Sequence, residues 1–321
     1  MRGLLIVNPH ATSTPGNGAD LVVAALRGLV SLDVARTAYR GHARELAAST
    51  SAELVVVLGG DGAINEAVNG LMERSGPRPL LAVLPGGGGN VFAQTIGMPT
   101  SATRAIDVLA GLVASLVASG DSRSIGLGLA GDRYFTFSAG VGMDAEVVHE
   151  VDQARARGRR ESPALFARAI LRRYYGGTER RVPVLTLDMP GRPPIDGLFM
   201  GIVMNSAPWT YLHGLPLLSR PFPDFSSGLD VLALNRLAFR DIVGAVGKML
   251  LTARRRLGPR GSHMMTAYGL DTVTFRCSRP AAFHVDGEYL GEVESVKFQF
   301  VPDALRVVAP PRPRDTVTGQ M

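Results

Sequence analysis

Residues 54–71, the most informative part of the chain, read LVVVLGGDGAINEAVNGL. A short apolar run leads directly into Gly59-Gly60-Asp61-Gly62, and a predicted helix follows at once. Glycines let main-chain N–H groups approach an anion because no Cβ blocks the way. The helix after such a turn adds unpaired N–H groups and the positive end of its dipole. The stretch therefore predicts a strand, a phosphate-binding turn and a helix.

A second glycine-rich turn occurs at the next predicted strand-to-helix connection. Residues 80–84 lead into Pro85-Gly86-Gly87-Gly88-Gly89-Asn90. Open α/β sheets bind their ligands at the carboxyl ends of parallel strands. Two such turns in succession therefore predict one cleft that holds phosphates.

Length and composition favour a protein of two domains in a reducing compartment. The chain has 321 residues, about the length of two ordinary domains. Its one cysteine, Cys277, excludes an intramolecular disulfide and lies in a run that predicts a strand. Residues 1–10 contain too short an apolar core for a signal peptide. No uninterrupted apolar run reaches the about eighteen residues of a membrane span, so we expect a cytoplasmic protein.

The net charge of +6 is unevenly placed, with arginine clusters at 153–181 and 254–260. Residues 153–181 contain nine arginines, and only Glu161 and Glu179 oppose them. Basic surfaces attract anionic membranes or nucleic acid. No motif or aromatic spacing of a nucleic-acid module is present, so nucleic acid is not expected as a partner. A solvated helix face and an anionic membrane surface both stay open as interpretations, and the second predicts a peripheral membrane location.

The first third of the chain alternates between predicted strands and helices. The strands are expected at 4–7, 32–38, 54–58 and 80–84, and the helices at 19–30, 42–50, 63–73, 90–96 and 102–116. This order is typical of a parallel sheet with helices on both faces. We predict an α/β domain at 1–122.

The pattern changes after this domain to short runs that alternate with period two. Strands are expected at 133–140, 183–189, 199–205, 229–234, 272–277, 282–285 and 293–301, and helices at 144–152, 164–175 and 240–252. We predict an antiparallel, β-sandwich-like domain at 123–309, whose last strand returns to the first domain. The tail at 310–321 is rich in Pro and Arg and is predicted to be disordered.

Motifs along nearly the whole chain share one order with a known family. They are Asn8-Pro9, Thr37, Gly41-His42-Ala43, GGDGAINEAVNG at 59–70, LPGGGGNVFAQTIGMP at 84–99, residues 139–144, Asn205, Gly228-Leu229-Asp230 and HVDGE at 284–288. In these residues the chain resembles the diacylglycerol kinase catalytic family, which includes bacterial lipid kinases and sphingoid-base kinases. The family shares its fold with NAD kinases, and the resemblance implies an active-site cleft between the two domains.

The resemblance implies a role for each motif. Asp61 would organise Mg²⁺ through water or act on the acceptor hydroxyl, and Glu288 would be the general base. The residues placed around the nucleotide, ATP, are Asn8, Thr37, Gly59, Gly60, Gly62, Ala63, Asn65, Glu66, Gly87, Gly88 and Asn90. Phosphoryl transfer requires this combination of positioning, charge neutralisation and a base near the acceptor hydroxyl. The implied function is an ATP-dependent lipid kinase acting on a lipid such as diacylglycerol or a sphingoid base.

Several residues depart from the family pattern. Ala63 replaces a threonine, Gly88 replaces a hydroxyl residue, and Val91 replaces an aspartate. Ser226-Ser227 stand where an acidic residue is usual, so the family's structural magnesium site in the second domain stays open. Losing one hydrogen bond to a charged group costs roughly 1.5–3 kcal/mol, so several losses together can slow catalysis. A catalytically weak protein that binds lipid or nucleotide is therefore an alternative.

Two further alternatives stay open. Asp286-Gly287 is also the strongest two-residue hairpin signal in the chain, and Glu288 would then be only the first residue of a return strand. An NAD kinase is the third functional hypothesis. The LPGGGGN turn and the Asp286-Gly287-Glu288 hairpin fit the lipid kinases of the family better than the NAD kinases. The identity of the lipid stays open, and so does a homodimer.

Overall fold

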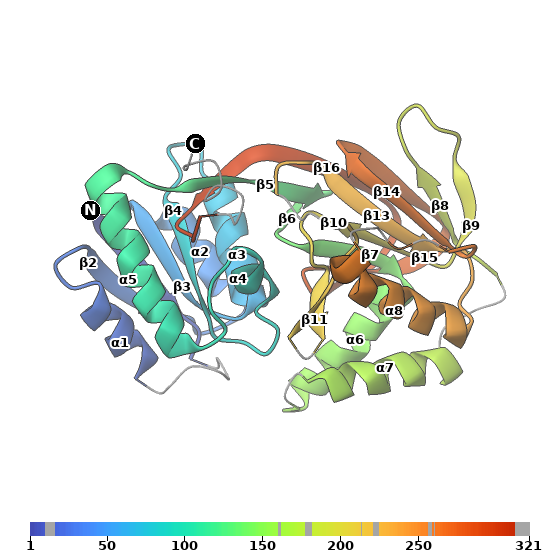
Figure 1. Ribbon diagram of the computed structural model, residues 1–321, viewed down its shortest axis with the longest axis horizontal. Helices are drawn as coiled ribbons and strands as arrows, with labels where there is room; N and C mark the ends of the chain where they lie inside the picture. The colour runs from blue at the N-terminus through green and yellow to red at the C-terminus, as the bar shows by residue number, and fades with distance from the viewer. Residues whose placement is uncertain are drawn as a thin grey trace. The chain divides into compact units, whose positions relative to one another are not determined.

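The computed structural model describes residues 1–9, 17–159, 162–176, 182–212, 214–220, 225–255, 259 and 261–311. The chain divides into two compact units, residues 1–125 with 303–321 (unit 1) and residues 126–302 (unit 2). Figure 1 shows the elements of both units. That 1–122 and 123–309 are separate domains stays a prediction. From residue 312 on, the tail expected to be disordered lies outside the described residues.

Unit 1 contains the predicted parallel sheet. Its strands are β1 (Arg2–Val7), β2 (Ser31–Arg36), β3 (Leu54–Gly59) and β4 (Leu80–Pro85), in the order β4-β3-β1-β2. The end of β16 (Glu288–Val307) joins β4 in parallel. All six residues of β3 are buried, which explains its uninterrupted apolar run, because a central parallel strand is covered on both faces.

Helices cover both faces of this sheet. Helix α1 (Gly18–Ala25) packs with α5 (Ala102–Ser119), and α2 (His42–Ser49) packs with α3 (Asp61–Met72). The short helix α4 (Val91–Thr95) follows β4. Right-handed crossovers require helices on both faces. The chain moves in one direction across the sheet from β1 to β2 and in the opposite direction from β3 to β4. The connections after β1 and β3 therefore leave the sheet toward opposite faces.

Helix α5 is the one described helix that is long and apolar enough, by length and composition, to cross a membrane. Arg104 and Asp107 interrupt it, so the sequence shows no unbroken apolar run there. Its buried residues recur at helical spacing, and the helix packs on β4 and α1. The core helix of a soluble unit shows the same pattern.

Unit 2 is built on an antiparallel sheet, which confirms the predicted fold class. Its central order is β14 (Met264–Leu270), β13 (Leu229–Leu234), β10 (Met200–Met204), β7 (Ser138–Gly142), β15 (Thr272–Val285) and β16. Strands β5 (Arg123–Ala130), β6 (Arg133–Phe135), β8 (Leu185–Asp188) and β9 (Ile195–Leu198) extend it. A separate hairpin pairs β11 (Thr210–Leu212) with β12 (Leu215–Leu217).

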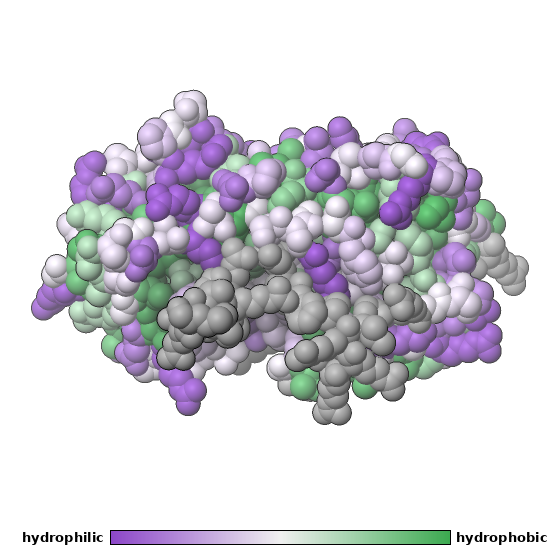
Figure 2. Space-filling model, turned by 45° about the horizontal axis from the view of Figure 1, so that its top comes forward, coloured by the Kyte–Doolittle hydropathy of each residue, from purple (hydrophilic) through white to green (hydrophobic). Residues whose placement is uncertain are grey.

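Two hydrophobic cores lie against this sheet. In one, Phe298 makes edge-to-face contacts with Phe135 and Phe275, with ring centroids 6.2 Å apart in each pair. In the other, α7 (Pro163–Gly176) and α8 (Phe239–Arg255) pack on residues of β10 and β13. Helix α6 (Met143–Ala156) packs beside α7. Figure 2 shows hydrophilic and hydrophobic residues interspersed over one face, as is usual on protein surfaces.

Differences from the expected elements have local causes. Strand β5 was not predicted because it contains Gly126 and Gly128, and glycine is rare inside strands. A Cβ at either position would overlap an aromatic ring, of Phe300 or Phe135 respectively. The single strand predicted at 133–140 is divided into β6 and β7, and the helix expected at 19–30 ends at Ala25.

Replacing Gly70 with alanine should destabilise unit 1. A Cβ at this position of α3 would overlap the backbone of Arg44 in α2, and such overpacking costs roughly 1–3 kcal/mol or more. Gly111→Ala in α5 is the matched control, because an added Cβ there meets nothing within 4 Å. The control should gain about 0.5–1 kcal/mol of helix stability. Chemical denaturation measures both changes, and equal stabilities would contradict the close contact of α2 and α3.

Candidate functional site

The carboxyl edge of the sheet in unit 1 brings the predicted nucleotide-binding residues together. Asn8 follows β1, and its N–H donates to β3 at 3.0 Å. Thr37 follows β2, and its N–H donates to the last residue of β1 at 2.9 Å. Gly86 follows β4, and its N–H donates to Gly59 at 2.9 Å. Since the chain leaves β1 and β3 toward opposite faces, this edge is a switch point, where open sheets bind ligands.

The two glycine-rich turns lie against each other. A Cβ on Gly60 would lie 3.1 Å from the Cα of Gly87, and a Cβ on Gly87 would lie 2.7 Å from the Cα of Gly60. A Cβ on Gly59 would lie 3.0 Å from the Cβ of Ala63. The close approach of the turns therefore requires glycine at 60 and 87, with or without a ligand.

The Asp61 carboxylate joins the first turn to the second. It accepts the N–H groups of Val91 at 3.0 Å and Phe92 at 3.1 Å, the first two residues of α4. A carboxylate at a helix N-terminus both satisfies free amides and balances the dipole. Asp61 therefore holds the β4–α4 connection in place, a role that the sequence did not predict.

Asn90 fixes the second turn from within. Its backbone is left-handed, with φ of 49°, and its Oδ1 accepts the N–H groups of Gly86 at 3.1 Å and Gly87 at 2.8 Å. Its Nδ2 donates to the Gly87 carbonyl at 2.6 Å. The amide of Gly87, expected to bind phosphate, already donates to Asn90. Gly88 and Gly62 are both exposed.

Asn65 and Glu66 make contacts inside unit 1. Asn65 is buried, and its Oδ1 accepts a hydrogen bond from Asn69 at 3.1 Å. Glu66 accepts the N–H of Ala43 at 3.2 Å, at the start of α2. Glu66 therefore helps to position α3 against α2, whereas the bond of Asn65 lies within α3.

Glu288 is in unit 2, at the start of β16. Asp286 and Gly287 both have positive φ, 45° and 75°, and join β15 to β16 as the sequence predicted for a two-residue hairpin. The Oε2 of Glu288 lies 2.9 Å from Nη2 of Arg133, and both side chains are mostly buried. Sequence reasoning missed Arg133, because its partner lies far along the chain.

Asp286 anchors the hairpin that carries Glu288. Its carboxylate accepts four hydrogen bonds, from the N–H groups of Thr136, Phe137 and Ser138 and from the Thr136 hydroxyl. Burial raises the pKa of this carboxyl above its usual value, and the amide hydrogen bonds oppose the shift. The amides lie between β6 and β7, which explains why the chain does not continue as one strand there.

A buried pair lies close to the same hairpin. His284 Nε2 is 2.6 Å from Asp144 Oδ2, and both side chains are buried or nearly so. A Cβ on Gly140 would collide with both groups, so the Gly140 of the family motif makes room for this pair. The structure thus brings together two sequence motifs of unit 2, residues 139–144 and HVDGE at 284–288.

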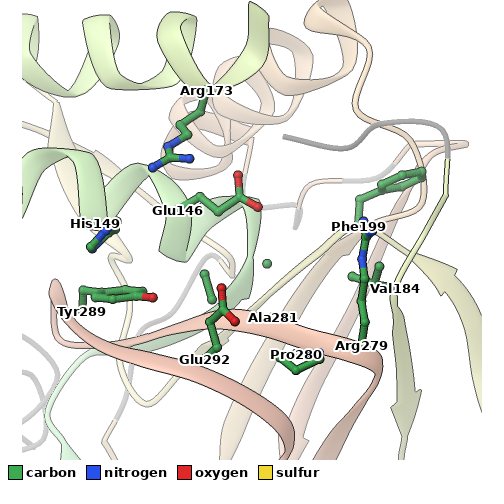
Figure 3. A pocket seen from close by; sticks show the side chains of 12 residues that line it. Glu146, His149, Arg173, Val184, Phe199, Arg279, Pro280, Ala281, Tyr289 and Glu292 are labelled. Carbon is green, nitrogen blue, oxygen red and sulfur yellow. The ribbon is translucent and has the colours of Figure 1, made fainter. Parts of the chain in front are cut away.

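A polar pocket of about 310 Å³ lies in unit 2 between α6, α7 and the β15–β16 hairpin. Figure 3 shows the carboxylates of Glu146 and Glu292 directed into it, with Arg173 and Tyr289 beside them. Burial raises the pKa of Tyr289, and the charge of Glu292 adds to the shift. Glu288 is not among the lining residues.

Asp230, of the Gly228-Leu229-Asp230 motif, is buried in an ion pair. Its Oδ2 lies 2.9 Å from Nε of Arg220, and its carboxylate also accepts hydrogen bonds from Ser219 and Gly269, each at 3.3 Å. Among the described residues no group of three or more His, Cys, Asp or Glu could hold a metal ion. At the position where the family has a structural magnesium site, Asp230 is therefore paired with Arg220.

Comparison with known proteins confirms the family resemblance. Residues 2–120 match the family described as Diacylglycerol kinase catalytic domain. The diacylglycerol kinase of Bacillus subtilis is 38% identical over 110 residues, 34% of each chain. Sphingoid long-chain bases kinase 1 of Arabidopsis thaliana is 32% identical over 34% of this chain and 16% of its own length. The matched part is thus about a third or less of these relatives.

Solved structures share the fold over the whole chain. A diacylglycerol kinase from Bacillus anthracis superposes with a TM-score of 0.69 at 17% identity, covering 97% of each chain. An NAD kinase from Archaeoglobus fulgidus in complex with ATP gives a TM-score of 0.55 at 12% identity, covering 99% of this chain and 98% of its own. These likenesses concern the fold.

Removing the Asp286 carboxylate should destabilise unit 2. Asp286→Ala leaves three buried N–H groups without an acceptor, and each such group costs about 1–3 kcal/mol, so we expect a loss of at least about 3 kcal/mol. Asp132→Ala, at an exposed position directly before β6, is the control and should change little. Thermal or urea unfolding measures both, and an equally small effect at Asp286 would contradict its anchoring role.

Asp230 should make stability depend on pH. Burial raises the pKa of its carboxyl to about 6 from 3.8, although Arg220 acts in the opposite direction. Because the folded pKa is above the unfolded one, this group's contribution is complete below about pH 4 and is lost as the pH rises through about 6. Relative to Asp230→Asn, the wild-type free energy of unfolding should fall by on the order of 3 kcal/mol over this window.

Asp241→Asn provides a control of opposite sign for the Asp230 measurement. A hydrogen bond from Arg236 lowers the pKa of Asp241, so the stability from this group is lost as the pH falls. Urea titrations of the three proteins across the pH range give the comparison. A wild-type curve parallel to that of Asp230→Asn would show that Asp230 ionises normally.

Proposed function

We propose that this chain is an ATP-dependent lipid kinase, which transfers the γ-phosphoryl group of ATP to a hydroxyl of a lipid such as diacylglycerol or a sphingoid base. The observation that carries the proposal is the packing of two glycine turns against each other at the switch point of the unit 1 sheet. The match of residues 2–120 to the diacylglycerol kinase catalytic domain supports it.

The ATP phosphates bind at the start of α3 in this proposal. The N-terminal amides of α4 already donate to Asp61, and the amides of Gly86 and Gly87 donate to Asn90. Gly62, in the first turn of α3, is exposed, and a Cβ added there would meet nothing within 4 Å. A twelve-residue helix presents free N–H groups and a positive dipole end to an anion. Asn8 and Thr37 lie along the same edge for the rest of the nucleotide.

Mg²⁺ fits this site through water and phosphate oxygens. Asp61 is the carboxylate at the turn, and in this proposal it would act on the ion through water, because both of its oxygens accept main-chain amides. Magnesium commonly keeps several waters and takes one or two carboxylates with substrate phosphates. When bound, it would neutralise the charge that develops on the transferred group.

Glu288 is the proposed general base. It would accept the proton of the lipid hydroxyl as the oxygen attacks the terminal phosphorus. The ion pair with Arg133 holds its carboxylate in one orientation, and the Asp286 anchor fixes the strand that carries it. A base that is positioned in this way contributes typically about 10²–10⁴-fold to the rate.

A catalytically weak binding protein is the second candidate. Ala63, Gly88 and Val91 lack the side chains that the family pattern places near the phosphates and metal. One structural observation favours it: both oxygens of the Asp61 carboxylate accept main-chain amides, which leaves this carboxylate less available to a metal ion. Such a protein would still bind nucleotide at α3.

We further propose a peripheral position on an anionic membrane in the cytoplasm, with the arginine-rich segment 153–181 at the lipid surface. Among its described arginines, Arg155, Arg157, Arg159, Arg168 and Arg172 are exposed. Arg155 pairs with Asp152 at 3.4 Å, and Arg172 and Arg173 pair with Glu150 at 3.7 and 3.2 Å. Each basic residue near an anionic surface contributes about 1 kcal/mol. The proposal also includes a homodimer, which light scattering would detect.

Purified protein with labelled ATP, Mg²⁺ and a total lipid extract tests the proposal. We expect a labelled lipid whose mass identifies the acceptor, and Glu288→Gln should lower the rate by about 10²-fold or more. Glu294→Gln, an exposed carboxylate on the same strand, is the matched control and should keep full activity. Label from the wild type no higher than from Glu288→Gln, together with measurable ATP binding, would favour the binding protein. Formation of NADP from NAD would point instead to the NAD kinase.

A further inference from the structure

Helices α7 and α8 expose a row of large apolar side chains. On α7 these are Leu171 and Tyr175, with 44% and 73% of their surface exposed. On α8 they are Phe239, Val243 and Leu251, with 43%, 53% and 39% exposed. We call these five residues the apolar face. Single exposed apolar residues are ordinary, but five on two neighbouring helices call for an explanation.

The two helices belong to one layer. The N–H of Phe239 donates to the Tyr174 hydroxyl at 3.0 Å, and the two rings are 5.8 Å apart. Ile170 and Tyr174 of α7 pack into the same core as Ile242 and residues of β10 and β13. Since both helices turn their inner sides to this core, their outer sides face away from the same side of the sheet.

The spacing along α8 shows that the apolar face is continuous. Phe239, Val243, Gly247 and Leu251 recur every four residues, which places them on one side of a helix. A Cβ on Gly247 or on Gly244 would meet nothing within 4 Å, so the helix backbone itself is accessible there. Helix α8 thus exposes apolar side chains, next to Arg240 and Lys248, in addition to those that it buries in the core.

Cations accompany the apolar face. Arg168 of α7 and Arg240 of α8 are exposed on the same two helices, and so is Arg172, whose Nε lies 3.7 Å from Glu150 of α6. Helix α7 contains no acidic residue, and the one acidic residue of α8, Asp241, is bound to Arg236 at 2.6 Å. Apolar side chains flanked by arginines are typical of helices that lie in a membrane interface.

We propose that the apolar face of α7 and α8 is the surface by which unit 2 enters an anionic lipid bilayer, with Arg168, Arg172 and Arg240 at the headgroups. The proposal deepens the proposed function, on which it rests, by assigning the membrane contact to specific residues. Charge distinguishes this partner from a second copy of the chain. A twofold contact would bring the same arginines together, whereas anionic headgroups neutralise them.

Sedimentation with lipid vesicles tests the proposal. The full chain is mixed with phosphatidylcholine vesicles, with and without phosphatidylglycerol. The variant Leu171→Gln, Tyr175→Gln, Phe239→Gln, Val243→Gln should bind the anionic vesicles at least about tenfold more weakly than the wild type. The matched control, Leu21→Gln with Val117→Gln, removes exposed apolar residues from unit 1 and should bind as the wild type does. Circular dichroism confirms that each variant is folded.

A charge variant and a soluble substrate complete the test. Arg168→Gln with Arg240→Gln should lose the preference for phosphatidylglycerol. Phosphorylation of a short-chain, water-soluble lipid should be the same in the apolar-face variant and the wild type, which separates docking from catalysis. Face-dependent vesicle binding by a protein without kinase activity would support the docking surface and contradict the proposed function.

Three results would overturn the docking proposal. One is a wild type that does not sediment with anionic vesicles. Another is equal loss of binding in the variant and in the unit 1 control. The third is a change from dimer to monomer in light scattering with vesicle binding unchanged, which would assign the apolar face to a contact between copies.

Discussion

The candidate site depends on one interaction, the capture of two main-chain amides by the Asp61 carboxylate. Asp61 ends the first glycine turn, and its partners Val91 and Phe92 begin α4 after the second. Because the turns also touch at Gly60 and Gly87, neither can move without the other. The geometry of the sheet edge follows from this pairing, since it fixes where the chain leaves β3 and where it leaves β4.

Unit 2 uses the same device at a different place. Asp286 accepts three successive amides, and the hairpin with Glu288 is held to the connection between β6 and β7. In each unit a carboxylate, Asp61 or Asp286, accepts main-chain amides from a distant part of the chain. A buried carboxylate is costly unless it is hydrogen-bonded, so such sites tolerate few alternative conformations.

The sequence predicted those features that short-range patterns determine. The run LVVVL specified β3, and Asp286-Gly287 specified the hairpin, because each depends on neighbouring residues alone. Arg133 as partner of Glu288 could not be predicted, because the two are 155 positions apart and meet only through the sheet. Strand β5 was missed for a related reason, since its glycines are explained only by the rings of Phe135 and Phe300. The sequence likewise could not show which main-chain amides are already bound by the side chains of Asp61 and Asn90.

The left-handed Asn90 has a consequence for how a ligand is received. With its side chain bonded to Gly86 and Gly87, a loop of four consecutive glycines, the most conformationally free sequence possible, is already ordered. In the proposed function, a nucleotide that binds at the neighbouring α3 terminus would not have to order this loop, so little of its binding energy would be spent on lost chain entropy.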